Sequence, residues 1–171
     1  MEPYRLTTMT THPASRLAAA ATTYCALVER LPRVTLTTTL RRLHRALLDV
    51  YVEGVALPSC RRRAPRRLPE PARAFIDVCR ALHARLGPHS GYQGVFDPLD
   101  ESDVGTGLSL VVDLADTWKD LERGLILWRS GNRDVAHAFW KLNYTIHWGR
   151  HAADGLRVLH HHVETPFPTG R

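Results

Sequence analysis

The stretch "TLTTTLRRLHRALLDVYVEGV" (residues 35–55) decides the predicted fold class. Its apolar residues recur at steps of three and four, which returns them to one face of an α-helix. They are Leu36, Leu40, Leu43, Leu47 and Val50. A helix with one apolar face buries that face against another element. The stretch therefore predicts one member of a packed helical assembly.

Four other segments carry the same helical spacing. With the first stretch, they predict helices over residues 14–31, 35–54, 69–86, 108–128 and 134–162. The intervening segment 87–107 is rich in Gly, Pro and Asp, and this composition is typical of a long loop. No segment shows a convincing β-strand pattern. We expect an all-α fold, a compact antiparallel bundle of about five helices with a long loop before the fourth helix.

The length of 171 residues corresponds to one domain. We expect a single helical-bundle domain over residues 13–163, between a flexible N-terminal tail (1–12) and a C-terminal tail (164–171). The longest apolar run near the start, "LAAAA", is too short for a membrane span. Three cysteines without a CxxC pair indicate neither a disulfide framework nor a thiolate zinc site. These features favour a soluble cytoplasmic protein with no membrane partner.

The positive charge is concentrated in one segment, "PSCRRRAPRR" (58–67). The formal net charge is +6, and the five arginines of this segment account for all but +1 of it. An arginine cluster of this kind attracts anions or nucleic acid. However, no aromatic residue is interleaved to stack on bases, and a solvated connector explains the same sequence. Both interpretations of Arg61–Arg67 remain open at this point.

The segment "KLNYTIHWGRHAADGLRVLHHH" (141–162) contains the strongest candidate site. His147 and His151 are four residues apart, and Asp154 follows at the next helical turn. Acidic residues share one sector of the preceding helix. They are Asp113, Asp116 and Asp120. The short connection at 130–133 predicts a helical hairpin in which Asp116 is level with His147 and Asp113 with His151.

Two interpretations fit this hairpin. The acidic residues hold the imidazoles in a structural polar network, or they bind a divalent metal together with them. The metal ligands would be Asp113, Asp116, His147 and His151. Trp148, Gly149 and Arg150 stand where an HExxH protease has its glutamate, which counts against peptide hydrolysis.

Further residues are expected to contribute to the network or to a binding surface. Tyr144 and Trp148 lie close to the two histidines in sequence. In the long loop, Tyr92, Phe96 and Asp97 occur within six residues. This loop segment is interpreted either as a plug over the end of the core or as half of a binding surface.

Three segments resemble a known family. They are "YQGVFDPL" (92–99), "DLADTWKDLERGL" (113–125) and "FWKLNYTIHWGRHAADGLRVLH" (139–160). The chain is similar, most strongly over residues 92–160, to the small bacterial proteins grouped as domain of unknown function 5063. The resemblance implies an all-helical cytosolic protein, and it implies no reaction.

Three functions remain open from the sequence. The first is a non-enzymatic protein-interaction module that needs no cofactor, because four Trp and five Tyr offer anchors for a protein partner. Its surface would lie on the last two predicted helices and the 88–105 loop. The alternative is a metal-dependent hydrolase or other metalloenzyme using Asp113, Asp116, His147 and His151. The third is binding of an anion or nucleic acid by Arg61–Arg67. Whether the protein is an enzyme is left undecided.

Overall fold

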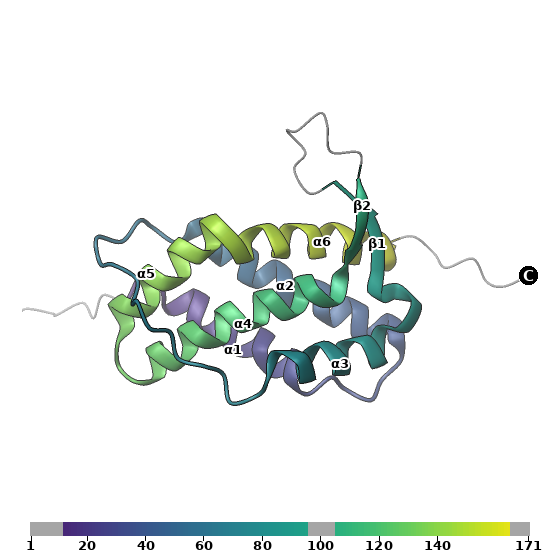
Figure 1. Cartoon of the computed structure of the whole chain (residues 1–171), viewed down its shortest axis with the longest axis horizontal. Helices are drawn as coiled ribbons and strands as arrows, with labels where there is room; N and C mark the ends of the chain where they lie inside the picture. The colour runs from purple at the N-terminus through teal and green to yellow at the C-terminus, as the bar shows by residue number, and fades with distance from the viewer. Residues whose placement is uncertain (1–11, 96–104, 165–171) are drawn as a thin grey trace, which may run out of the picture.

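The computed structural model describes residues 12–95 and 105–164, and most of this part of the chain is helical. Figure 1 shows the helices packed along the long axis of the molecule, with a small hairpin standing above one end. The helical elements are α1 (Ser15–Glu29), α2 (Leu36–Ala56), α3 (Phe75–Leu86), the short 3₁₀ turn η1 (Gly87–Ser90), α4 (Leu110–Arg129), α5 (Arg133–Asn143), the π-helical turn η2 (Tyr144–Trp148) and α6 (Gly149–Glu164). The predicted helical bundle is confirmed.

The stretch that predicted the fold class forms α2. Its N-cap is Thr35, whose hydroxyl accepts a hydrogen bond from the Thr38 amide at 3.2 Å. The apolar stripe faces inward, because Leu40, Leu43 and Val50 are at most 1% exposed. Helix α2 packs between α1 and α6. Burial of the stripe thus joins two helices that are far apart in the sequence.

Helix α4 is at the centre of the bundle and contacts α1, α3, α5 and α6. The Tyr24 hydroxyl of α1 donates to the Leu114 carbonyl at 2.9 Å in the buried interface with α4. Gly131 ends the helix with a φ of +85°, a conformation that glycine adopts without steric cost. The chain then reverses, so α4 and α5 form the predicted helical hairpin. None of the helices in the described ranges is long and apolar enough to cross a membrane.

The expectation of no β-strand was wrong. Strands β1 (Gly91–Gly94) and β2 (Thr106–Ser109) pair antiparallel, from Gly91 opposite Ser109 to Gly94 opposite Thr106. Each strand has four residues, two of them glycine in β1, so neither carries a readable alternation of apolar and polar residues. Phe96 and Asp97, for which a plug or a binding surface was expected, lie outside the described residues.

Two predicted boundaries also differ from the structure. Helix α3 begins at Phe75, so Pro69 and Pro71 precede it rather than forming its first turn. His12 was placed in a flexible tail, but its ring contacts the Trp128 ring at a centroid distance of 5.1 Å and its Nε2 lies 3.1 Å from Asp134 Oδ1. The packed part of the chain therefore includes His12.

The predicted helix at 134–162 is not continuous. A π-helical turn, η2, separates α5 from α6. Gly149 permits this turn, since a Cβ at that position would collide with the Tyr144 carbonyl oxygen. Gly54 of α2 permits the close packing of η2 against α2, because a Cβ at position 54 would lie 2.5 Å from Trp148 Cη2. Turns of this kind occur mostly as single insertions, often at functional sites.

Candidate functional site

A polar seam runs between α4 and the η2–α6 segment. We define it by its members Asp113, Asp116, Asp120, His147 and His151. Helix α4 presents the three carboxylates on successive turns, while η2 and α6 contribute one imidazole each. The two elements are in contact along the bundle (Figure 1). The carboxylates of α4 and the two imidazoles therefore lie against each other, as the sequence predicted.

Each imidazole contacts a buried carboxylate through its Nδ1 atom. The distance from His151 Nδ1 to Asp113 Oδ1 is 2.9 Å, and that from His147 Nδ1 to Asp120 Oδ2 is 2.8 Å. The side chains of Asp113 and Asp120 are only 8% and 4% exposed. Since a carboxylate only accepts hydrogen bonds, both contacts require a proton on Nδ1. The buried acids therefore hold both rings in one orientation.

One of the two predicted contacts is shifted. Asp113 meets His151 as predicted, but His147 bonds to Asp120 rather than to Asp116. His147 lies within the π-helical turn η2, whose residues do not follow the α-helical spacing on which the predicted level rested. Its partner is the acid one turn nearer to the α4–α5 connection.

Tyr92 joins the seam from strand β1. Its hydroxyl donates to Asp113 Oδ2 at 2.7 Å, so Asp113 is bonded through both oxygens. Burial and this hydrogen bond raise the pKa of Tyr92 well above its usual range. Asp154 of α6 lies beside the seam, where burial and the nearby Asp113 raise its pKa. The β1–β2 hairpin thus helps to position the histidine–aspartate pairs.

Asp116 occupies the middle of the seam and does not bond directly to either imidazole. Its Oδ1 accepts from Lys119 Nζ at 2.8 Å, and its side chain is 13% exposed. One ligand atom each from Asp116, His147 and His151 lies within 4.8 Å of the others. The two rings are 4.9 Å apart in an edge-to-face arrangement. Because each Nδ1 is engaged, the Nε2 atoms are the ones left to bind a ligand.

The structure separates two expected site residues from the seam. Tyr144 packs on Tyr51 of α2, with ring centroids 5.9 Å apart, and on Trp148 at 5.0 Å. Trp148 is fully buried and donates from Nε1 to the Trp140 carbonyl at 3.2 Å. These aromatic residues hold η2 against α2.

Lys119 was not identified from the sequence as a residue of the site. Its position three residues after Asp116 on the same helix could have indicated this ion pair.

Comparisons with known proteins agree with the fold. The chain belongs to the family described as "Domain of unknown function (DUF5063)", whose model matches residues 9–165. The resemblance seen over residues 92–160 therefore extends over most of the chain. The crystal structure of protein BF1032 from Bacteroides fragilis is similar, with a TM-score of 0.75 and 18% identity, covering 92% of this chain and 96% of that one. This likeness shows the fold alone. No curated protein matches the chain.

Proposed function

We propose that this member of the DUF5063 family binds one divalent transition-metal ion through Asp116, His147 and His151. The observation that carries the proposal is the convergence of the three ligand atoms within 4.8 Å. Two of these ligands are imidazoles whose Nδ1 already contacts a buried carboxylate. Metal-binding histidines in proteins usually have such a partner, which sets the tautomer and raises the basicity of the ligand.

The four residues predicted as metal ligands are accordingly given two different roles, as ligands or as groups that orient a ligand. Asp113 orients His151 and Asp120 orients His147, so neither acid is proposed as a ligand. Asp116 supplies the carboxylate, because Lys119 bonds only to its Oδ1 and leaves Oδ2 for a metal. Lys119 also balances the charge of Asp116 when no ion is bound. Two imidazoles and one carboxylate favour zinc, iron, manganese or cobalt over calcium or magnesium.

Three protein ligands leave coordination positions open. Such sites bind water or a substrate directly, and the metal then acts as a Lewis acid that lowers the pKa of bound water. The His147 side chain is 35% exposed, so solvent reaches this part of the seam. This supports a metalloenzyme, with hydrolysis as the simplest reaction class. In this chain Asp116, His147 and His151 would hold the ion, while Asp120 and Asp113 orient the two rings through Nδ1.

Metal content tests the proposal most directly. The protein is purified without a His tag, dialysed, and analysed for zinc, iron, manganese and cobalt. We expect close to one ion per chain in the wild type and a large loss in Asp116→Asn, which keeps the fold because, within residues 12–95 and 105–164, the one side-chain hydrogen bond of Asp116 is to Lys119. A variant with His160, His161 and His162 changed to Gln is the matched control and keeps its metal.

The opposite result would overturn the proposal. It would be a metal content far below one per chain in the wild type, with no rise in melting temperature when any of these ions is added. Ligand binding to the folded state must stabilise it, so a metal that binds the seam has to raise the melting temperature. Loss of metal in the three-histidine control, with full retention in Asp116→Asn, would move the site to the end of α6.

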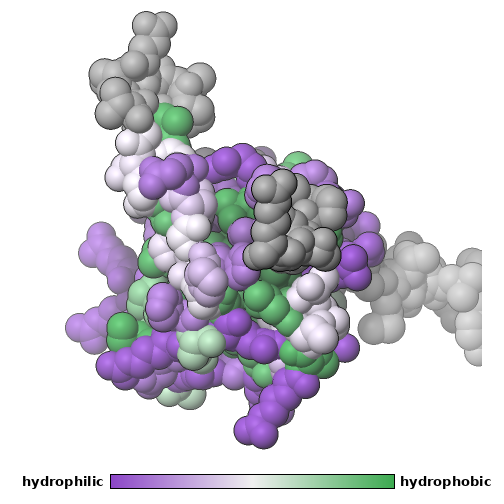
Figure 2. Space-filling model, turned by 90° about the vertical axis from the view of Figure 1, so that its right-hand side faces the viewer, coloured by the Kyte–Doolittle hydropathy of each residue, from purple (hydrophilic) through white to green (hydrophobic). Residues whose placement is uncertain are grey.

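A protein-interaction module is the second candidate, supported by exposed apolar side chains. Leu142 and Ile146 are 47% and 64% exposed on the α5–η2 surface. At the opposite end, which carries the hairpin, Figure 2 shows apolar areas that are separated by hydrophilic ones. The surface around Leu142 is therefore the better place for a partner. Replacing Leu142 and Ile146 by Ser should then abolish any self-association or complex, as measured by light scattering. Unchanged association would exclude this surface.

A further inference from the structure

A basic groove lies between α5 and the connection after α2. Its walls include Arg62, Arg63 and Ala64 on the connection, and Ala138, Lys141 and Leu142 on α5. The connection passes beside α5 at the end of the bundle opposite to the hairpin (Figure 1). The groove encloses about 550 Å³. It shares no residue with the polar seam, so a ligand can bind in it whether or not the seam holds a metal.

The cations of this groove have no counter-charge among the described residues. Neither Arg62 nor Arg63 forms an ion pair with any residue in ranges 12–95 and 105–164, and the Lys141 ammonium lies 5.5 Å above the Tyr144 ring instead of on a carboxylate. Asp134, at the same end, already contacts His12. The groove therefore presents a positive potential that attracts anions.

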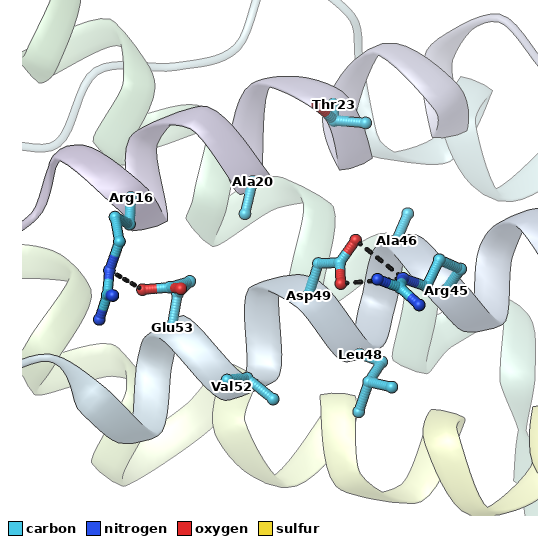
Figure 3. A pocket seen from close by; sticks show the side chains of 9 residues that line it. All are labelled: Arg16, Ala20, Thr23, Arg45, Ala46, Leu48, Asp49, Val52 and Glu53. Carbon is cyan, nitrogen blue, oxygen red and sulfur yellow. Dashed lines mark hydrogen bonds and ion pairs between the residues drawn. The ribbon is translucent and has the colours of Figure 1, made fainter.

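A second groove, between α1 and α2, shows the contrast (Figure 3). Arg16 of α1 pairs with Glu53 of α2 at 3.1 Å, and Arg45 pairs with Asp49 at 3.1 Å. Each cation that lines it thus has a carboxylate partner on the protein, and its charge is already compensated. Of the two grooves, the one beside α5 has cations that form no ion pair with the residues the structure describes.

The basic groove also has an apolar strip. Leu142, which is 47% exposed, lines the groove together with Ala64 and Ala138. Among the residues that the structure describes, no aromatic ring lines the groove to stack on bases, as single-stranded nucleic acids require. A ligand that is charged and aliphatic fits this lining best. Acidic peptides with alternating aliphatic side chains have both properties.

The connection is held in place before any ligand binds. His137 Nε2 donates to the Pro58 carbonyl at 2.8 Å, and Ala64 and Leu68 pack against the core. A wall fixed in this way loses little conformational entropy on binding. Guanidinium groups at such a wall can bind carboxylates in a bidentate manner.

We propose that this groove binds an acidic peptide segment of a partner protein. Carboxylates of the peptide pair with Arg62, Arg63 and Lys141, and an aliphatic side chain of the peptide packs on Leu142. The arginine segment, for which the sequence left anion or nucleic-acid binding open, is thereby assigned to a peptide.

Fluorescence anisotropy with a labelled peptide of alternating Glu and Leu tests this proposal. Changing both Arg62 and Arg63 to Ala should weaken binding by about tenfold or more, the usual effect of losing charge-assisted hydrogen bonds. Leu142→Ser should weaken it several-fold. The matched control changes Arg41 and Arg42 of α2, also adjacent and exposed, to Ala and should leave the affinity unchanged. A peptide with Gln in place of Glu should not bind.

Three results would overturn the proposal. The first is no binding of the Glu–Leu peptide to the full-length protein. The second is an equal loss of affinity in the Arg41/Arg42 control, which would indicate a general charge effect. The third is that single-stranded DNA binds as tightly as the peptide and is unaffected by Leu142→Ser, which would assign the groove to a polyanion.

Discussion

The polar seam and the basic groove are both rich in ionisable side chains, but they use them in opposite ways. In the seam, each imidazole contacts a carboxylate, and Asp113 is bonded through both of its oxygens. In the groove, Arg62 and Arg63 form no ion pair within the part of the chain that the structure describes. Buried polar groups must be paired for the fold to be stable. Exposed cations carry no such requirement, so their charge remains available to a ligand.

The largest effect on stability is expected for Asp113→Ala. This change removes the acceptor of both His151 and Tyr92 and should lower the free energy of unfolding by about 2–4 kcal/mol, because two partly buried partners lose their hydrogen bonds. Urea denaturation measures it. Asp113→Asn keeps one acceptor oxygen and should cost less. Equal stability of the wild type and Asp113→Ala would show that the seam does not support the fold.

Gly149→Ala tests the π-helical turn that carries His147. The added methyl group meets the Tyr144 carbonyl, and overpacking of this kind costs about 1–3 kcal/mol. We also expect the metal content to fall, because His147 moves relative to Asp116. Gly131→Ala disturbs only the turn before α5 and is the comparison for the metal content. A Gly149→Ala protein with wild-type stability would mean that the turn accommodates a Cβ.

His147→Ala should lower the free energy of unfolding by about 1–2 kcal/mol, because Asp120 is left buried without this partner. His12→Ala is the informative comparison. Its ring contacts Trp128 and Asp134, so we expect a loss of about 1 kcal/mol rather than the negligible cost of a residue in a loose tail. Thermal and urea denaturation with a chelator present separate these losses from metal binding.

The pH dependence of stability should reflect two histidines outside the seam. Burial and the neighbouring His160 lower the pKa of His44 from 6.5, although Glu164 opposes this shift. Burial, His89 and His161 lower the pKa of His162. A histidine with a lowered folded-state pKa stabilises the fold above pH 6.5, and this stability is lost as the pH falls. Melting temperatures between neutral and mildly acidic pH, with a chelator, should therefore fall less in a His44→Gln, His162→Gln protein. An identical slope in wild type and variant would contradict this.

The smallest effect is expected in the groove. Changing Arg62 and Arg63 to Ala should alter the free energy of unfolding by less than about 0.5 kcal/mol, since both are exposed and form no ion pair with residues 12–95 or 105–164. The same protein is expected to lose peptide binding. A clear loss of stability would show that these arginines serve the fold, and it would remove the contrast with the seam.

Much of the fold was readable because helical faces are a local property. The Leu36–Val50 stripe predicted α2, and Gly131 predicted the reversal between α4 and α5. The pairing of Asp113 with His151 followed from that reversal. The four-residue strands were not readable, because they are short and glycine-rich and are stabilised by pairing with each other.

The sequence by itself determined which residues form helices and which face of each helix is apolar, because these depend on spacing along one chain. Only the tertiary structure decided the π-helical turn, since Gly54 of α2 and Gly149 must together allow Tyr144 and Trp148 to pack so closely. That packing assigns Asp120 rather than Asp116 to His147 and leaves Asp116 for a ligand. The tertiary structure also decided which charges are paired, because the partner of a charge is set by distance in space.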